Sequence, residues 1–137
     1  MGTPEAVEIP FRDLAHGHSY ETGGGLFFYR TQDSWAAQWR RMHHHRLPEP
    51  PLAGVDWAID MVVLLVCGTR PSGGYQLTIE SIAVDGTSIE VRAVERRPGR
   101  NAYAPAVITN PFHAVAVAAH DCTERLTLRI EYHHFDP

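Results

Sequence analysis

The alternation of apolar and polar positions predicts a chain made mostly of short β-strands. Residues 61–67 form an unbroken, valine-rich apolar run, which predicts a central strand covered on both faces. Apolar stretches at 26–29 and 112–119 predict two more buried strands. Residues 7–11 alternate around Pro10, as in a short edge strand, and residues 126–132 alternate as in a strand with one face in water.

Residues 34–45 are predicted to form a helix, the only one in the chain. Asp33 or Ser34 is expected to cap it, because short polar side chains accept backbone N–H bonds at a helix start. The helix is expected to end before the LPEPP segment, where prolines remove donors and disfavour helical geometry. Large apolar side chains recur on one helical face: Trp35, Trp39 and Met42.

A bulged β-hairpin is predicted in the middle of the chain. The parity of the apolar positions changes within 77–84, and an extra residue near Glu80 and Ser81 would keep all of them on one face. A two-residue turn at Asp85 and Gly86 would then set the register. The expected pairs are Ile82 with Ile89, Ile79 with Val91, and Leu77 with Ala93.

Two connecting segments are rich in turn formers. Gly68 to Gly74 is predicted to turn the chain between two adjacent strands, because it combines a proline with residues that tolerate positive φ. Residues 95–105 carry charge, proline and glycine, and are expected to form an exposed loop. The carboxylates, Glu95 among them, are expected on outward strand faces or in turns.

These elements predict an α+β, mainly antiparallel domain: a twisted sheet or sandwich-like β domain with one N-terminal helix packed on it. A length of 137 residues with 44% hydrophobic and 20% charged side chains is typical of one globular core. Residues 1–137 are therefore expected to form a single domain. The exposed final strand could pair with a second copy, because an edge strand offers unpaired backbone groups.

Charge and hydropathy exclude some classes of partner. A formal net charge of −4 provides no positive field for phosphate backbones, so nucleic acid is not expected as a partner. No apolar stretch is long enough to span a bilayer, so no membrane is expected. The start of the chain lacks the basic and apolar segments of a secretion signal, which predicts a cytoplasmic protein as given, with an exported form that has lost a leader left open.

Nine histidines raise the question of a metal site. Seven of them cluster at 16 and 18, at 43–45, and at 133 and 134, and adjacent positions on a helix or strand diverge too far to share one ion. Only His16 and His18 could share a face, and two ligands do not complete a site, so they are weak candidates and no cofactor is expected. Residues 43–45 are interpreted as a solvated helix end, where cations complement the helix dipole.

Neither cysteine has the surroundings of a nucleophile. Cys67 lies in an apolar run, where burial raises the pKa of a thiol, and Cys122 has only chance polar neighbours. Two reduced thiols are expected, and whether they pair is left open because it depends on their separation in the fold. No G-x-S-x-G motif or paired carboxylates are present, so the chain is not expected to be an enzyme.

The segment GTRPSGGYQLTIESI, which begins at Gly68, resembles the C-terminal domain of the PrcB family of protease-complex subunits, whose G-x-R-P-[ST]-G-G-Y turn joins two strands. Further similar segments are SWAAQW, VDWAIDMVV, ERRPG and TNPFHAVAV, so that the resemblance covers about residues 26–119. It implies a non-enzymatic accessory or assembly module that binds a protein partner, with a protease as the candidate. The residues implied in partner binding are Arg70, Pro71, Ser72, Gly73, Gly74, Tyr75, Arg97 and Pro98.

Two alternatives remain open on the sequence. RPSGGY is similar to the N-P-[ST]-[ST]-G-[YF] loop of chagasin-type cysteine-protease inhibitors, which plugs an active-site cleft, although Arg70 and Gly73 depart from that pattern. This similarity implies a protease inhibitor that acts through the turn. The histidine content supports the third alternative, a metal- or ligand-binding domain.

Overall fold

The computed structural model describes residues 6–20, 23–44, 46, 48–99, 107–120 and 125–135. Eight strands and one helix follow one another along this part of the chain, with the helix between the third and fourth strands. The elements are β1 (Val7–Ile9), β2 (Phe11–His18), β3 (Gly24–Tyr29), α1 (Gln32–His43), β4 (Asp60–Cys67), β5 (Gln76–Asp85), β6 (Ser88–Pro98), β7 (Pro111–Ala118) and β8 (Arg125–Phe135).

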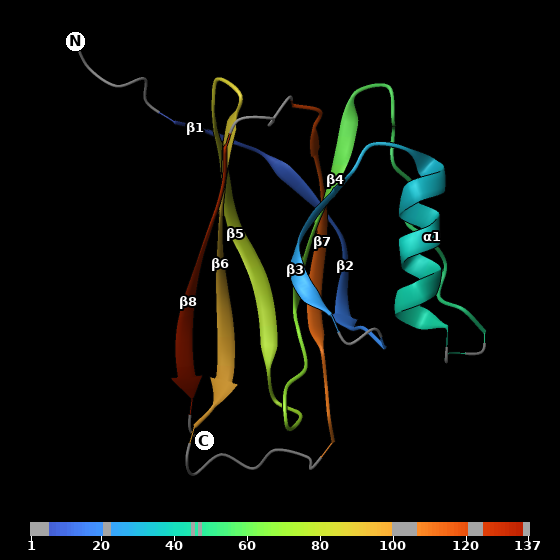
Figure 1. Cartoon of the computed structure of the whole chain (residues 1–137), viewed down its shortest axis with the longest axis vertical. Coiled ribbons are helices and arrows are strands. Elements are labelled where there is room, and N and C mark those ends of the chain that lie inside the picture. Colours follow the sequence, from blue (N-terminus) through green and yellow to red (C-terminus); the bar gives the residue numbers. More distant parts are fainter. Residues whose placement is uncertain are drawn as a thin grey trace.

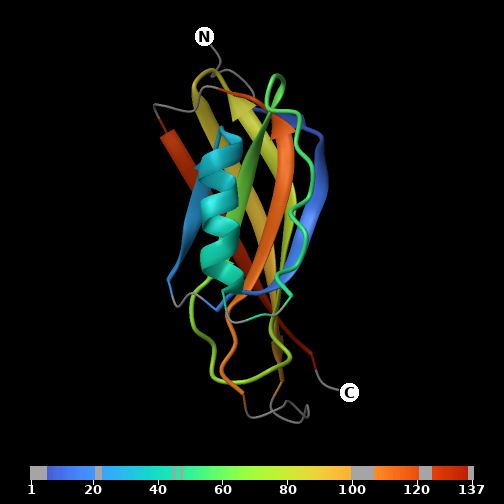
Figure 2. The same cartoon turned by 90° about the vertical axis from the view of Figure 1, so that its right-hand side faces the viewer.

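The strands form two four-stranded sheets that stack face to face, and α1 covers the outer face of one of them (Figures 1 and 2). The first sheet has the order β1-β5-β6-β8, and the second has the order β2-β7-β4-β3. Neighbouring strands are antiparallel except for β6 and β8, which are parallel. The predicted sandwich-like, mainly antiparallel α+β fold is confirmed. No helix among the described residues is long and apolar enough to cross a membrane.

Strand β4 contributes to two hydrophobic cores. Met61, Val63 and Leu65 point between the two sheets, where they pack with the apolar side chains of the β5–β6 hairpin. The alternate residues of β4, such as Val62 and Leu64, pack beneath α1. This double burial explains the unbroken apolar run and confirms the predicted central strand, which lies between β3 and β7.

Helix α1 covers the second sheet with its apolar face. Trp35, Trp39 and Met42 are buried, as their spacing predicts. The predicted bounds and cap were wrong: the helix runs from residue 32 to 43, and Thr31 caps it by accepting the N–H of Ser34 at 3.2 Å. The cap lies earlier because a threonine two residues before Asp33 provides the same hydroxyl acceptor.

His43, expected at a solvated helix end, is buried instead. Its ring lies 4.1 Å from the ring of Trp39 and 5.8 Å from that of Phe112, and its Nδ1 contacts the carbonyl of Trp39 at 3.0 Å. This burial lowers the pKa of His43. It is the flat imidazole, rather than its charge, that suits this aromatic layer.

The first strands divide between the two sheets at Pro10. Residues 7–11 were predicted as one edge strand, but β1 pairs with β5 in the first sheet and β2 pairs with β7 in the second. Pro10 forms the corner, where its missing N–H costs no ladder bond. The strand character of 12–18 was missed because those residues are largely polar and the strand is a bulged edge.

The bulge in β5 is confirmed, but the predicted hairpin register was wrong by two residues. The β5–β6 ladder shifts between Ile79 and Ser81, and the two turn residues are Gly86 and Thr87. The observed pairs are Val84 with Ile89, Ile82 with Val91, Ile79 with Ala93, and Leu77 with Glu95. Because the register moved by an even number, the apolar side chains still face the core, and Glu95 takes a core position.

The connection from β4 to β5 crosses between the sheets, so the prediction that residues 68–74 join two adjacent strands was wrong. Gly68 and Gly74 stand at the two ends of this crossing with φ of 88° and 86°, which only glycine adopts without strain. The predicted loop at 95–105 was also wrong in its first part. Strand β6 continues to Pro98, and residues 100–105 lie outside the described residues.

Strand β8 forms an edge of the first sheet. The predicted wet face is confirmed, because Arg129, Glu131 and His133 are exposed. On the other face Ile130 packs against the core between the sheets, whereas Leu126, Leu128 and Tyr132 remain exposed.

Candidate functional site

A buried carboxylate organises the end of the sandwich that carries the sequence-predicted turn. We call this region the turn end and define it as residues 68–75, 95–98 and 107–110. Glu95 is 1% exposed, and its Oε1 accepts hydrogen bonds from Arg70, with Nε at 2.7 Å and Nη2 at 2.6 Å. Arg97 donates from Nε to the other carboxylate oxygen. Glu95 therefore joins an arginine of the turn to an arginine of β6.

Cys67 completes the surroundings of this carboxylate. Its thiol donates to Oε1 of Glu95 at 3.1 Å. Burial, with the hydrogen bond to Glu95, raises the pKa of Cys67 to about 12. The expectation that burial raises the pKa of this thiol is confirmed, and Cys67 is free. Cys122 lies outside the described residues.

The charges of the site hold Glu95 ionised. Burial alone would raise the pKa of Glu95, but hydrogen bonds from Arg97, Cys67 and Arg70 outweigh it and hold the pKa below its ordinary value. The guanidinium of Arg97 also lies over the ring of Tyr132, 4.0 Å from its centre. Strands β6 and β8 and the turn thus meet in one polar cluster.

The backbone of the turn is anchored to the residues just before β7. Arg70 and Thr109 exchange two backbone hydrogen bonds of 2.7 and 3.0 Å. The hydroxyl of Thr109 donates to the carbonyl of Ser72 at 2.8 Å, and the side chain of Asn110 accepts the N–H of Gly68 at 2.9 Å. Sequence reasoning assigned no role to Thr109 or Asn110, although both belong to the TNPFHAVAV segment of the resemblance.

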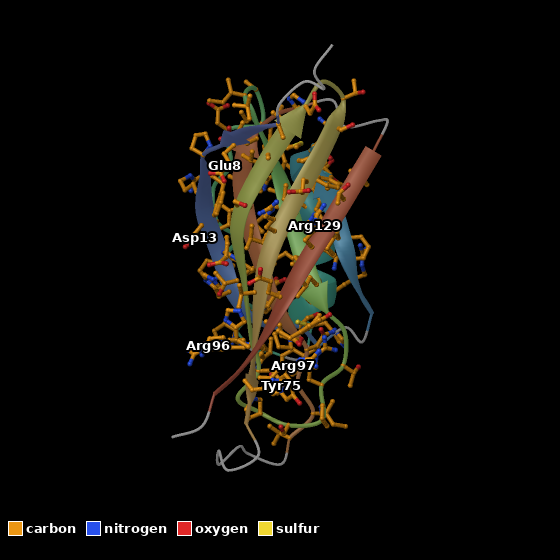
Figure 3. All side chains as sticks on the ribbon, turned by 90° about the vertical axis from the view of Figure 1, so that its left-hand side faces the viewer. Glu8, Asp13, Tyr75, Arg96, Arg97 and Arg129 are labelled. Carbon is orange, nitrogen blue, oxygen red and sulfur yellow. The ribbon has the colours of Figure 1, made fainter. Side chains whose placement is uncertain are left out.

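The structure brings the sequence-predicted partner-binding residues together but gives them different exposure. Arg70 and Arg97 meet on Glu95, so their head groups are engaged inside the turn end. Pro71 and Gly74 are exposed. The remaining predicted residues are half-buried or buried: Ser72, Tyr75 and Pro98 are half-buried, and Gly73 is buried. Figure 3 shows Tyr75 beside Arg97 at this end of the sandwich, with Arg96 projecting outward.

A cavity of about 330 Å³ opens beside Tyr75. Its walls come from the end of β2, the start of β5 and the start of β7, so it lies at the open side of the sandwich next to the turn. His16 and His18, the weak metal candidates, both line it, together with Phe112 and Thr78. The cavity therefore connects the turn with the histidines that the sequence had singled out separately.

His16 lies within a cluster that has the composition of a metal site. One ligand atom each from Asp13, His16 and His113 lie within 4.8 Å of one another. However, Nδ1 of His113 accepts the backbone N–H of Ile79 at 2.8 Å, so the ring proton is on Nε2, which donates to Asp13 at 2.7 Å. A metal on Nε2 would move that proton to Nδ1, against the N–H of Ile79.

The hydrogen bonds of His113 thus disfavour a metal and indicate a structural role. His113 satisfies a backbone donor at the bulge of β5, across the two sheets. Its ring stacks on that of His16 at 3.8 Å, an arrangement in which the two ring planes do not converge on one ion. Burial lowers the pKa of His113, so the ring is neutral at pH 7.

Two stacked sheets, a helix on one outer face and an internally anchored turn define a small β-sandwich domain with a preformed surface at one end. Residues 61–118, from β4 to β7, match the model of the family described as PrcB C-terminal. The match confirms the resemblance over this part of the chain. The match does not include residues 26–60, which the resemblance had also covered. No curated protein and no solved structure matches the chain.

Proposed function

We propose that this protein is a non-enzymatic accessory module that binds a protein partner through the turn end. The observation that carries the proposal is the way the turn is fixed from inside. Arg70 is tied to Glu95, and the turn backbone is tied to Thr109 and Asn110, while Pro71 and Gly74 remain exposed. A surface fixed in advance loses little conformational entropy on binding, which favours recognition.

The cavity beside Tyr75 gives this surface a recess for one side chain of the partner. Its apolar wall includes Phe112 and Leu77, and its polar wall includes His18 and Gln76. Interfaces concentrate their binding energy where an anchor side chain fills such a recess. The resemblance to protease-complex subunits supports a protease, or a protein bound to one, as the partner.

The side chains that catalysis would need are engaged in structural hydrogen bonds. The thiol of Cys67, with its pKa raised to about 12, serves as a donor to Glu95. The imidazole of His113 is held between Ile79 and Asp13. These contacts support a binding role rather than a chemical one.

Affinity capture from the native source tests the proposal. The wild-type protein should retain a specific partner, and Tyr75→Ala should lose it, because Tyr75 joins the turn to the cavity. Ile59→Ala is the control, since Ile59 is an exposed apolar residue that precedes β4 and lies at the far end of the sandwich. Retention of the same partner by both variants, or of none by the wild type, would refute the proposal.

Protease inhibition through the same turn remains the alternative. It differs from an accessory role in its effect on the partner: an inhibitor abolishes cleavage of a peptide substrate when added in excess. A panel of cysteine and serine proteases that keep full activity in the presence of the protein would remove this alternative and leave the accessory role intact.

A further inference from the structure

Strand β8 presents an apolar row at an open edge of the sandwich. Leu126, Leu128 and Tyr132 are 52%, 38% and 51% exposed, although their partners on β6 belong to the core side of the sheet. One edge of β8 pairs with β6 along its whole length, and no described strand pairs with the other edge. An unpaired edge of this length with an exposed apolar face indicates an interaction surface.

The other sheet edges in the described part of the chain are protected against strand addition. Strand β1 has three residues, and β2 is interrupted by a bulge between Asp13 and Ala15. Strand β3 begins with two glycines and has six residues. Strand β8 has eleven residues and no proline, glycine or bulge. It alone among these edges has the regularity that strand addition requires.

We propose that β8 pairs with β8 of a second copy, antiparallel and about a two-fold axis through Ile130. In this register Arg129 lies opposite Glu131 of the second copy, and Glu131 lies opposite its Arg129. Both side chains are accessible to a neighbour, since they are 65% and 75% exposed, although Arg129 also contacts Glu90 and Glu131 also contacts His133 within the chain. The strand sequence is therefore complementary to itself in charge, and opposite charges on facing strands stabilise pairing.

Charge favours this register over the two adjacent registers in which the core sides of the two β8 strands also lie on the same face of the joined sheet. Moving the axis by one residue, to Arg129 or to Glu131, places two arginines or two glutamates directly opposite each other, which is destabilising. The axis at Ile130 also uses all eleven residues of β8. The two copies would then form one continuous eight-stranded sheet.

The apolar row is complementary in the same register. Leu128 lies opposite Tyr132 of the second copy, an aliphatic side chain against an aromatic one, on the core side of the sheet. Two copies of each contact form around the axis. The pairing thus covers Leu128 and Tyr132, two of the exposed apolar residues, from both chains.

Sedimentation equilibrium with charge-reversal variants tests the dimer. The wild type should show a species of twice the chain mass of 15.3 kDa. Arg129→Glu and Glu131→Arg each place like charges opposite at both symmetric contacts, which should raise the dimer dissociation constant by about tenfold or more. The double variant restores opposite charges and should return the constant to near the wild-type value.

Two contacts within the chain need controls. Glu131 lies 3.3 Å from His133, and His133→Gln, which removes this contact without reversing a charge, should leave the dimer intact. Arg129 also donates to Glu90 of β6 at 3.1 Å, so its reversal disturbs a second ion pair. Glu90→Gln removes that pair, together with the pair between Glu90 and Arg92, and adds no charge to β8. It should leave the dimer intact, and far-UV circular dichroism checks the fold of every variant. A monomeric wild type, a single variant that dimerises as well as the wild type, or a double variant as weak as the single ones would overturn the proposal. So would a wild-type monomer whose β8 becomes protected only by an extended peptide of another protein.

Discussion

Glu95→Gln removes the charge that joins the two arginines of the turn end while it preserves the shape of the side chain. The carboxylate accepts hydrogen bonds from Arg70, Arg97 and Cys67. A hydrogen bond to a charged group stabilises by about 1.5–3 kcal/mol. The guanidiniums of Arg70 and Arg97 are partly exposed and recover some hydration, and the amide oxygen keeps one bond, so we expect a loss of about 2–3 kcal/mol rather than the full sum.

Thermal unfolding followed by circular dichroism measures this loss. At about 2.1 cal/mol/K per residue, a chain of 137 residues unfolds with an entropy near 0.3 kcal/mol/K, so the Tm should fall by about 7–10 °C. Glu90→Gln is the matched control: the same change on the same strand, at a carboxylate that also contacts two arginines, Arg92 and Arg129, but on the exposed face. Its Tm should change little, because exposed ion pairs contribute about 0–1 kcal/mol. Equal Tm changes for the two variants would refute the structural role of Glu95.

Three further predictions concern single side chains or glycines. Burial lowers the folded-state pKa of His113 below 6.5, so the unfolded chain binds a proton at this histidine more readily than the folded chain does, and stability should fall as the pH drops below about 6.5. His113→Gln should flatten this dependence of Tm on pH, and the exposed His133→Gln should not. An unchanged slope in His113→Gln would count against the assignment. In a Cys122→Ser background, Cys67 should react slowly with a thiol reagent at pH 8 and rapidly after denaturation, because its pKa is raised to about 12. Equal reaction rates in the folded and the denatured protein would contradict the role of the Cys67 thiol as a buried hydrogen-bond donor. A Cβ on Gly24 would lie 2.7 Å from the backbone N of Gly68 and 2.9 Å from the carbonyl carbon of Cys67, so Gly24→Ala should destabilise the fold by about 1–3 kcal/mol. The control is Gly23→Ala, whose Cβ would meet nothing within 4 Å and which should be neutral. A Gly24→Ala variant that is as stable as the wild type in chemical denaturation would disprove the close approach.

Local patterns predicted the elements whose burial depends on their own sequence. The spacing of apolar residues predicted the tryptophan face of α1, the doubly covered β4 and the bulge in β5, because apolar residues occur at the positions that each element buries. The hairpin register failed because Asp85-Gly86 and Gly86-Thr87 are both acceptable turns, and only the pairing of whole strands decides between them.

The parts that failed depend on contacts between distant segments. Glu95 occurs in a charged stretch and was expected outside; it is buried because Arg70, from a segment that crosses between the sheets, reaches it. His113 acts through the backbone of Ile79 in the other sheet. The resemblance located the turn at 70–75, but only the structure shows that its arginine points inward and that Tyr75 borders a cavity.

Hydrogen–deuterium exchange of the chain, alone and with its captured partner, tests most directly whether the turn end is the binding surface. We expect the partner to slow exchange in residues 70–78 and 16–18, which form the turn and the cavity beside it, and to leave the β5–β6 hairpin tip at 85–88 unchanged. Protection confined to α1 or to the hairpin tip, with unchanged exchange at 70–78, would contradict it.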